Sequence, residues 1–231
     1  MLGPAAVAVL LHEAVAHALE ADTLAATGRP EAAVGLRFAA PGVHVLDDPA
    51  SAPAGVRRTV DDEGSPVCRR WLLRDGIVET PLADLRWSRA SAAFLPGAGR
   101  RGSRHLPPGP RSTHLELLSG ETAEADLLAE AAGGLFLPEA SRGRLDPLSG
   151  EFELCFPWAR RLARREPARE IADLVGPCRL RGRVAEILER VTAIGQERRP
   201  GGAGWCAKGG QKLPVWAVAP ALRLEGVEVV A

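Results

Sequence analysis

The chain has 231 residues, enough for one large domain or two small ones with a substantial core. Its 29 basic residues balance its 29 acidic residues, so the charge gives no sign of a nucleic-acid partner. The four cysteines are far apart and form no C-x-x-C pair, which argues against a disulfide framework and favours a reducing cytoplasm. No apolar run approaches the length of a membrane span. We therefore expect a cytoplasmic protein that binds neither membrane nor nucleic acid.

The first third of the chain predicts a helix followed by strands. Residues 4–27 are rich in alanine and carry apolar side chains spaced for one buried face, which is typical of a helix. Gly28 and Pro30 predict its end. Short apolar or β-branched runs follow, separated by Asp, Gly and Pro, and they predict a meandering sheet. These predicted strands span residues 34–38, 43–46, 67–73 and 76–80.

The rest of the chain alternates predicted strands with two helices and two loops. Residues 96–112 form a long loop rich in Pro, Gly and Arg, and loops of this length are usually functional or disordered. A second, glycine-rich loop contains Cys206. The other predicted elements are strands at 113–118, 134–138, 151–156, 214–218 and 221–230, and helices at about 122–132 and 180–193. We expect one α+β domain over residues 1–231, with a mostly antiparallel, twisted, open barrel-like sheet, the N-terminal helix and two further helices.

The stretch HEAVAH, residues 12–17, places two histidines five residues apart. On a regular α-helix such residues point about 140° away from each other, so both could not bind one ion. A single π-turn would bring them onto nearly the same face, and such bulges concentrate at functional sites. The alternative is an ordinary helix with one core histidine and one surface histidine.

A zinc site needs at least three protein ligands, so His12 and His17 require a partner. The candidates are the four cysteines and the three other histidines: Cys68, Cys155, Cys178, Cys206, His44, His105 and His114. Cys155 lies in an apolar run and is predicted to be a core residue, while Cys178 fits either role. Cys206 lies among glycines beside Lys208, where a backbone can approach a ligand closely and a cation favours thiolate. A His₂Cys set leaves one position open for water or substrate.

These residues resemble the C-terminal domain of the TldD/PmbA family of bacterial and archaeal metallopeptidases. The resemblance rests on six segments in the family's order: 10–22, 59–67, 99–114, 149–154, 191–197 and 204–224. It implies that His12, His17 and Cys206 bind Zn²⁺ and that Glu13 is the catalytic base. It also implies hydrolysis of unstructured peptides or small proteins, bound in extended form by sheet edges.

Some features depart from the family's pattern. Ala16 stands where glycine is usual inside the bulged turn, and His114 stands where asparagine is common. The chain begins just before the zinc helix, whereas family members carry an N-terminal domain that helps form the cleft and the dimer. We therefore expect a homo- or hetero-oligomer with a TldD/PmbA-like chain or with a separate N-terminal half. The alternative function is a non-catalytic or partner-dependent subunit of a heteromeric protease.

Three further residues are candidates for supporting roles. Glu20 follows His17 by one turn and could orient a metal ligand from behind, although a solvated helix face fits equally well. Arg104 and His105 lie in the long loop and could bind a peptide's carboxylate or backbone. Without the family resemblance, a solvated loop is the simpler interpretation of that pair.

Overall fold

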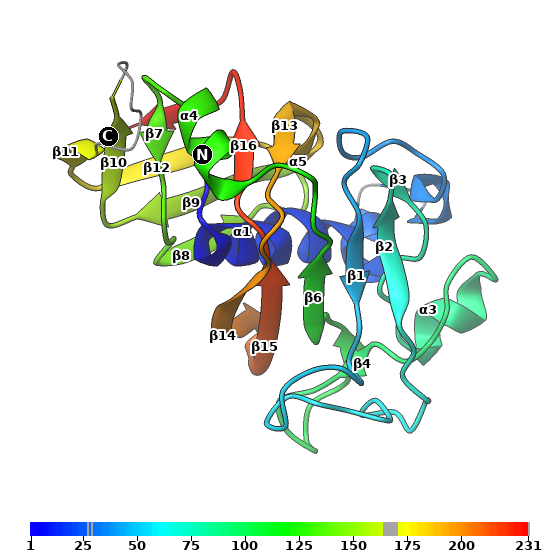
Figure 1. Cartoon of the computed structure of the whole chain (residues 1–231). Coiled ribbons are helices and arrows are strands. Elements are labelled where there is room, and N and C mark those ends of the chain that lie inside the picture. The colour runs from blue at the N-terminus through cyan, green and yellow to red at the C-terminus, as the bar shows by residue number, and fades with distance from the viewer. Residues whose placement is uncertain (27, 29, 164–170, 231) are drawn as a thin grey trace.

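The computed structural model describes residues 1–26, 28, 30–163 and 171–230, and its largest sheet has six strands in the order β14-β15-β6-β1-β2-β3 (Figure 1). These strands are β1 (Val45–Asp47), β2 (Arg70–Arg74), β3 (Ile77–Val78), β6 (His114–Leu117), β14 (Arg199–Lys208) and β15 (Gln211–Ala219). β15 and β6 run parallel, and the other pairs are antiparallel. Alternate residues of β15 are buried, as expected for a strand with one face on the core.

A four-stranded antiparallel sheet, in the order β17-β12-β9-β8, forms the second layer. Its strands are β8 (Arg142–Leu145), β9 (Glu151–Phe156), β12 (Cys178–Arg183) and β17 (Glu228–Val230). The smaller sheets join β7 (Leu135–Phe136), β10 (Ala159–Leu162) and β11 (Ile171–Val175); β13 (Val191–Ile194) and β16 (Leu222–Leu224); and β4 (Gly99–Arg100) and β5 (Gly109–Pro110). The strand orders are open, so within the described ranges no sheet closes into a barrel.

The N-terminal segment is a chain of short helices of different pitch. It comprises α1 (Pro4–Leu10), the π-helix η1 (Leu11–Ala16), the 3₁₀ turn η2 (His17–Leu19) and α2 (Ala21–Ala26). The remaining helices are η3 (Pro30–Ala33), α3 (Leu85–Ala90), α4 (Glu124–Glu130), α5 (Val184–Ile187) and η4 (Leu188–Arg190). In the part of the chain described here, no helix has the length and apolar character needed to cross a bilayer.

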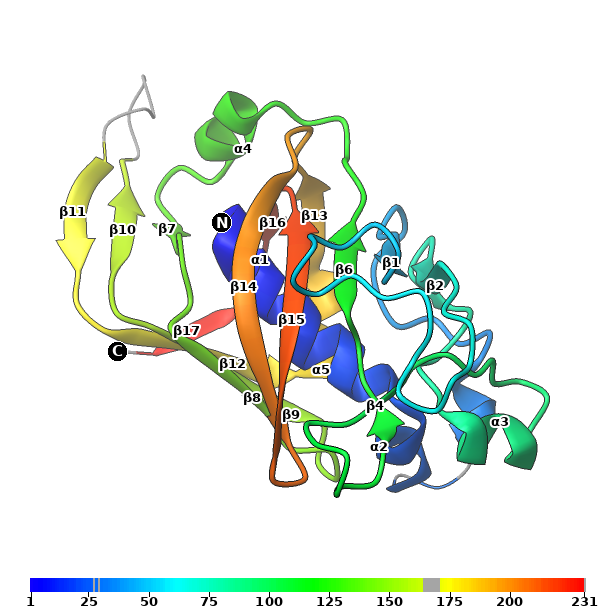
Figure 2. The same ribbon diagram turned by 90° about the horizontal axis from the view of Figure 1, so that it is seen from below.

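The segment α1–η1 lies between the two larger sheets (Figures 1 and 2). α1 contacts β14 and β15 on one side and β8 on the other, and the buried core is continuous from one sheet to the other through this segment. Small residues permit the close approach, since a Cβ added to Gly201 of β14 would overlap the Cβ of Ala8. The alanine-rich sequence therefore sets how near the strand carrying Cys206 can come to the helix.

The structure confirms an α+β fold of mostly antiparallel sheets with an N-terminal helix, and it corrects several boundaries. The single helix predicted at 4–27 is interrupted by the π and 3₁₀ turns and by an extended Glu20; residue 27 lies outside the described residues. The prediction of a helix at 180–193 was wrong. Residues up to Arg183 belong to β12, because Leu180 and Cys178 are buried with a period of two, and only 184–190 are helical.

The two predicted loops are also more ordered than expected. The glycine-rich segment before Lys208 is the ten-residue strand β14, paired along its length with β15. The loop at 96–112 contains the short β4–β5 ladder. Residues 34–38 were predicted as a strand but form only an isolated bridge at Arg37. The helix α3 and the strands β8, β10 and β11 were not predicted from the sequence.

The contact between Gly201 and Ala8 predicts a large effect of a single methyl group. Gly201→Ala should lower the free energy of unfolding by about 1–3 kcal/mol, because the added Cβ overpacks the interface of β14 with α1. Gly204→Ala, on the same strand, places its Cβ in ordinary contact with Val215 and should change stability by less than about 0.5 kcal/mol. Urea denaturation of both variants checks this, and equal effects would contradict it.

Candidate metal centre

The π-turn that five-residue spacing requires is present. The backbone N–H of His17 donates to the carbonyl oxygen of His12, and the two imidazole rings lie with centroids 4.5 Å apart. Ala16, inside this turn, has φ −62° and ψ −54°, which any L-residue adopts. The turn therefore does not need a glycine at this position. The alternative of an ordinary helix with two divergent histidines is excluded.

Cys206 meets the two histidines from β14. Its side chain is 1% exposed, and its Sγ lies 3.5 Å from Nε2 of His17. One donor atom from each of His12, His17 and Cys206 lies within 4.8 Å of the others. Two segments almost 190 residues apart in sequence thus bring together three side chains that can bind one ion.

The chemistry of this group fits zinc. A thiolate with two imidazoles is a donor set that zinc prefers, and three ligands leave one position open. Both ring nitrogens of His12 are buried and have no hydrogen-bond partner in the protein, an arrangement that costs about 1–3 kcal/mol unless something binds them. Burial and the neighbouring His17 lower the pKa of His12 to about 3, so its imidazole is neutral and its nitrogens are free to bind a metal. Burial opposes the charged form of His17, but Glu20 and Cys206 raise its pKa to about 11, so a metal would displace the proton from that ring.

Glu20 lies behind His17, as one of the two interpretations of the sequence expected. Its Oε2 is 3.0 Å from Nδ1 of His17, and the side chain is 0% exposed, so the solvated-face alternative is wrong. The ammonium of Lys208 lies 2.5 Å from the same oxygen. Burial alone would raise the pKa of Glu20, but His17 and Lys208 lower it to about 2. Glu20 is therefore a buried carboxylate held by two donors.

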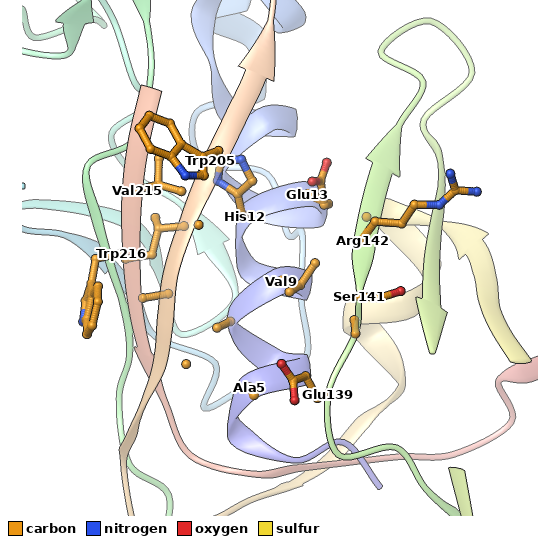
Figure 3. A pocket seen from close by; sticks show the side chains of 17 residues that line it. Ala5, Val9, His12, Glu13, Glu139, Ser141, Arg142, Trp205, Val215 and Trp216 are labelled. Carbon is orange, nitrogen blue, oxygen red and sulfur yellow. The ribbon is translucent and has the colours of Figure 1, made fainter. Parts of the chain in front are cut away.

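Glu13 lies at a cleft beside the three candidate ligands. Figure 3 shows His12 on the side of the helix facing β14 and Glu13 on the side facing β8. A cavity of about 340 Å³ runs along this face, and Glu13 also lines a second cavity of about 240 Å³ that reaches His17. A Cβ added to Gly143 of β8 would overlap the side chain of Glu13. Burial raises the pKa of the Glu13 carboxyl above its ordinary value.

Other candidate residues lie elsewhere. Arg104 and His105 are exposed, bond to each other at 3.1 Å and line neither cavity, so their contact with substrate stays a prediction. Cys178 is buried in β12. Cys155 is only half-buried, with Sγ 3.3 Å from Nε of Arg142 rather than in the core.

The sequence did not reveal the wall of the cleft formed by β8 and the residues before it. Ser141 and Gly143 line the larger cavity from this side. The strand 142–145, RGRL, alternates exposed with half-buried positions and has a single apolar residue, so it carries no apolar period that could mark a strand. Figure 3 shows Arg142 pointing away from the helix.

Comparison with known proteins shows the family to which the chain belongs. The model of the PmbA/TldA metallopeptidase C-terminal domain matches residues 1–231. The chain belongs to this family. It is 30% identical over 235 residues to a metalloprotease TldD homolog of Haemophilus influenzae, covering 99% of this chain and 47% of that protein. A metalloprotease of Methanothermobacter thermautotrophicus is 28% identical over 227 residues, covering 98% and 48%.

Solved structures of other proteins share the fold. TldE from Thermococcus kodakarensis superposes with a TM-score of 0.75 at 20% identity, over 100% of this chain and 49% of that one. The match of the family model over residues 1–231 confirms the resemblance to TldD/PmbA proteins deduced from the sequence. The chain spans about half the length of the curated relatives it matches.

The unpartnered nitrogens of His12 predict an unusual response to substitution. In the zinc-free chain, His12→Leu should leave the free energy of unfolding unchanged or raise it by about 1–2 kcal/mol, because it removes two unsatisfied polar atoms from the core. Leu11→Ala, at the neighbouring buried position, should cost about 2–5 kcal/mol. Urea denaturation in the presence of a chelator measures both, and a loss in His12→Leu as large as in Leu11→Ala would contradict the prediction.

Proposed function

We propose that this chain is the zinc-binding catalytic part of a metallopeptidase that hydrolyses unstructured peptides or small proteins. The observation that carries the proposal is the convergence of His12, His17 and Cys206 beside Glu13 at a cleft. Curated relatives along the whole chain are named metalloproteases, which supports a peptidase.

His12, His17 and Cys206 would hold the zinc ion. When bound, zinc supplies a Lewis acid that polarises a peptide carbonyl and makes water a better nucleophile at neutral pH. Nδ1 of His17 faces Glu20, which leaves Nε2 toward Cys206 as the coordinating nitrogen.

Glu13 would act as general base and then as general acid. Its carboxylate would accept a proton from the attacking water and deliver it to the departing amine. Burial raises its pKa, which suits a group that must both take and give a proton near neutral pH. Because Gly143 has no side chain, there is space beside it for the side chain of Glu13.

The substrate would lie extended between two sheet edges. β14 ends the six-stranded sheet, β8 ends the four-stranded sheet, and the larger cavity lies between them along α1 and η1 (Figure 3). Edge strands offer unpaired backbone groups to an added strand, and main-chain hydrogen bonds of this kind supply affinity for an extended peptide. Trp205, 70% exposed on β14, lines both cavities and supplies an apolar wall.

We further propose that the chain acts in an oligomer with a TldD/PmbA-like chain. This proposal is supported by a relative named a metalloprotease TldD homolog and by a structural neighbour named TldE. The alternative function, a non-catalytic subunit of such an assembly, is separated from the catalytic one by the variant of Glu13 described next.

Two variants should separate the effect on metal binding from the effect on catalysis. Glu13→Gln should keep about one zinc per chain and lose roughly 10²–10⁴-fold in kcat on an unstructured peptide, because it removes the base but no ligand. Cys206→Ser should lose the zinc itself. Elemental analysis and a quenched-fluorescence peptide assay measure the two properties, in the chain alone and in its assembly. Full activity in Glu13→Gln would leave the non-catalytic alternative, and no zinc in the wild type would refute the metal centre.

A methyl group at Gly143 should impair catalysis without emptying the metal site. Gly143→Ala should lower kcat by at least about tenfold while the zinc content stays unchanged, because the added Cβ displaces the carboxylate of Glu13 by a distance that catalytic geometry does not tolerate. Gly182→Ala in the same sheet, where the Cβ meets only Phe152 at 3.5 Å, is the matched control. Equal kcat in the two variants would show that Gly143 does not position Glu13.

A further inference from the structure

Lys208 connects the strand that carries Cys206 to the segment that carries His17. It is the last residue of β14, two positions beyond Cys206 and next to the tight turn at Gly209 and Gly210. Its Nζ lies 2.5 Å from Oε2 of Glu20, 2.6 Å from Oδ1 of Asp22 and 3.3 Å from Oγ1 of Thr23. One ammonium group thus contacts three residues that follow His17 in sequence.

The contact with Glu20 bears directly on a candidate ligand. The same carboxylate oxygen, Oε2, faces both Nδ1 of His17 and Nζ of Lys208, while Oε1 is buried without a hydrogen-bond partner. Lys208 therefore holds Oε2 of Glu20 in place, and this oxygen in turn orients the imidazole ring of His17. The opposite nitrogen of that ring, Nε2, lies 3.5 Å from Sγ of Cys206.

The backbone of Lys208 is held as well. Nη2 of Arg111 donates to the carbonyl oxygen of Lys208 at 3.3 Å, and Nη1 of the same guanidinium lies 3.9 Å from Oδ2 of Asp22. Arg111 is itself buried. The end of β14 and the start of α2 are therefore joined twice, by the Lys208 side chain and through Arg111.

We propose that Lys208 is a positioning residue of the metal centre, which through Glu20 sets the orientation of His17 and at the same time keeps Cys206 in register with it. The inference rests on the proposed zinc site and adds to it a residue that contacts neither metal nor substrate. Groups of this kind behind a ligand typically change metal affinity 10–100-fold when they are removed.

Zinc affinity, measured by competition with a chromophoric chelator, tests the proposal without any activity assay. Lys208→Met should weaken zinc binding about 10–100-fold. Lys208→Arg, which keeps a cation near Glu20, should recover at least part of the loss. Lys212→Met is the matched control, since Lys212 is exposed on the same hairpin, and it should bind zinc like the wild type. Equal affinities of Lys208→Met and Lys212→Met would overturn the proposal.

A double-mutant comparison separates positioning through Glu20 from a general loosening of the hairpin. In a Glu20→Gln background, Lys208→Met should cause little further loss, whereas independent effects would add. Additive losses would overturn the role assigned to Glu20. Asp22→Asn, which removes the other ion pair of Lys208, should weaken binding far less than Lys208→Met.

Circular dichroism of the zinc-free variants checks that each is folded. If Lys208→Met does not fold, Glu20→Gln alone takes its place, because it weakens the same contact from the other side with little change in shape. Wild-type affinity in that variant would overturn the proposal. If the wild type and Lys208→Met bind zinc equally well, this inference alone is refuted. If the wild type binds no zinc, both the metal centre and the inference are refuted.

Discussion

One backbone hydrogen bond, from the N–H of His17 to the carbonyl of His12, is the constraint on which the site depends. It inserts one extra residue into a helical turn. Two histidines that would otherwise point apart therefore face the same partner. The chain then leaves the helix at Glu20, whose extended backbone lets its carboxylate return to His17. The irregular pitch of this segment therefore places three side chains of the candidate site.

The second requirement is that β14 lies very close to this segment. Gly201 passes Ala8 without room for a Cβ, and five residues later the same strand brings Cys206 to His17. At the end of β14, the ion pair of Lys208 with Glu20 joins the strand to the helical segment. A fully buried carboxylate is costly unless it is paired and hydrogen-bonded. The buried Glu20 of the helical segment therefore needs Lys208 of the strand, and their ion pair holds the two elements together.

Local sequence patterns predicted the elements whose apolar periodicity is strong. They failed where pairing with a neighbouring strand decides the secondary structure. The strand β9 was placed at its observed bounds, because its alternation of buried residues is regular. The segment 180–193 has apolar residues at both helical and strand spacing, and pairing of its first half with β9 decides the outcome. Glycines in β14 suggested a loop, yet β15 supplies a continuous partner and α1 requires small residues there.

The sequence by itself determined the α+β class and the helical start, because composition and apolar spacing are local properties of the chain. The resemblance of six ordered segments to a known family added His12, His17 and Cys206 as candidate ligands. The sequence also limited the two histidines to one geometry in which they could cooperate. Only the tertiary structure decided that Glu20 is buried, that Lys208 faces it, and that Gly143 gives Glu13 its space. Those facts arise from contacts between residues more than a hundred positions apart, and no local pattern encodes them.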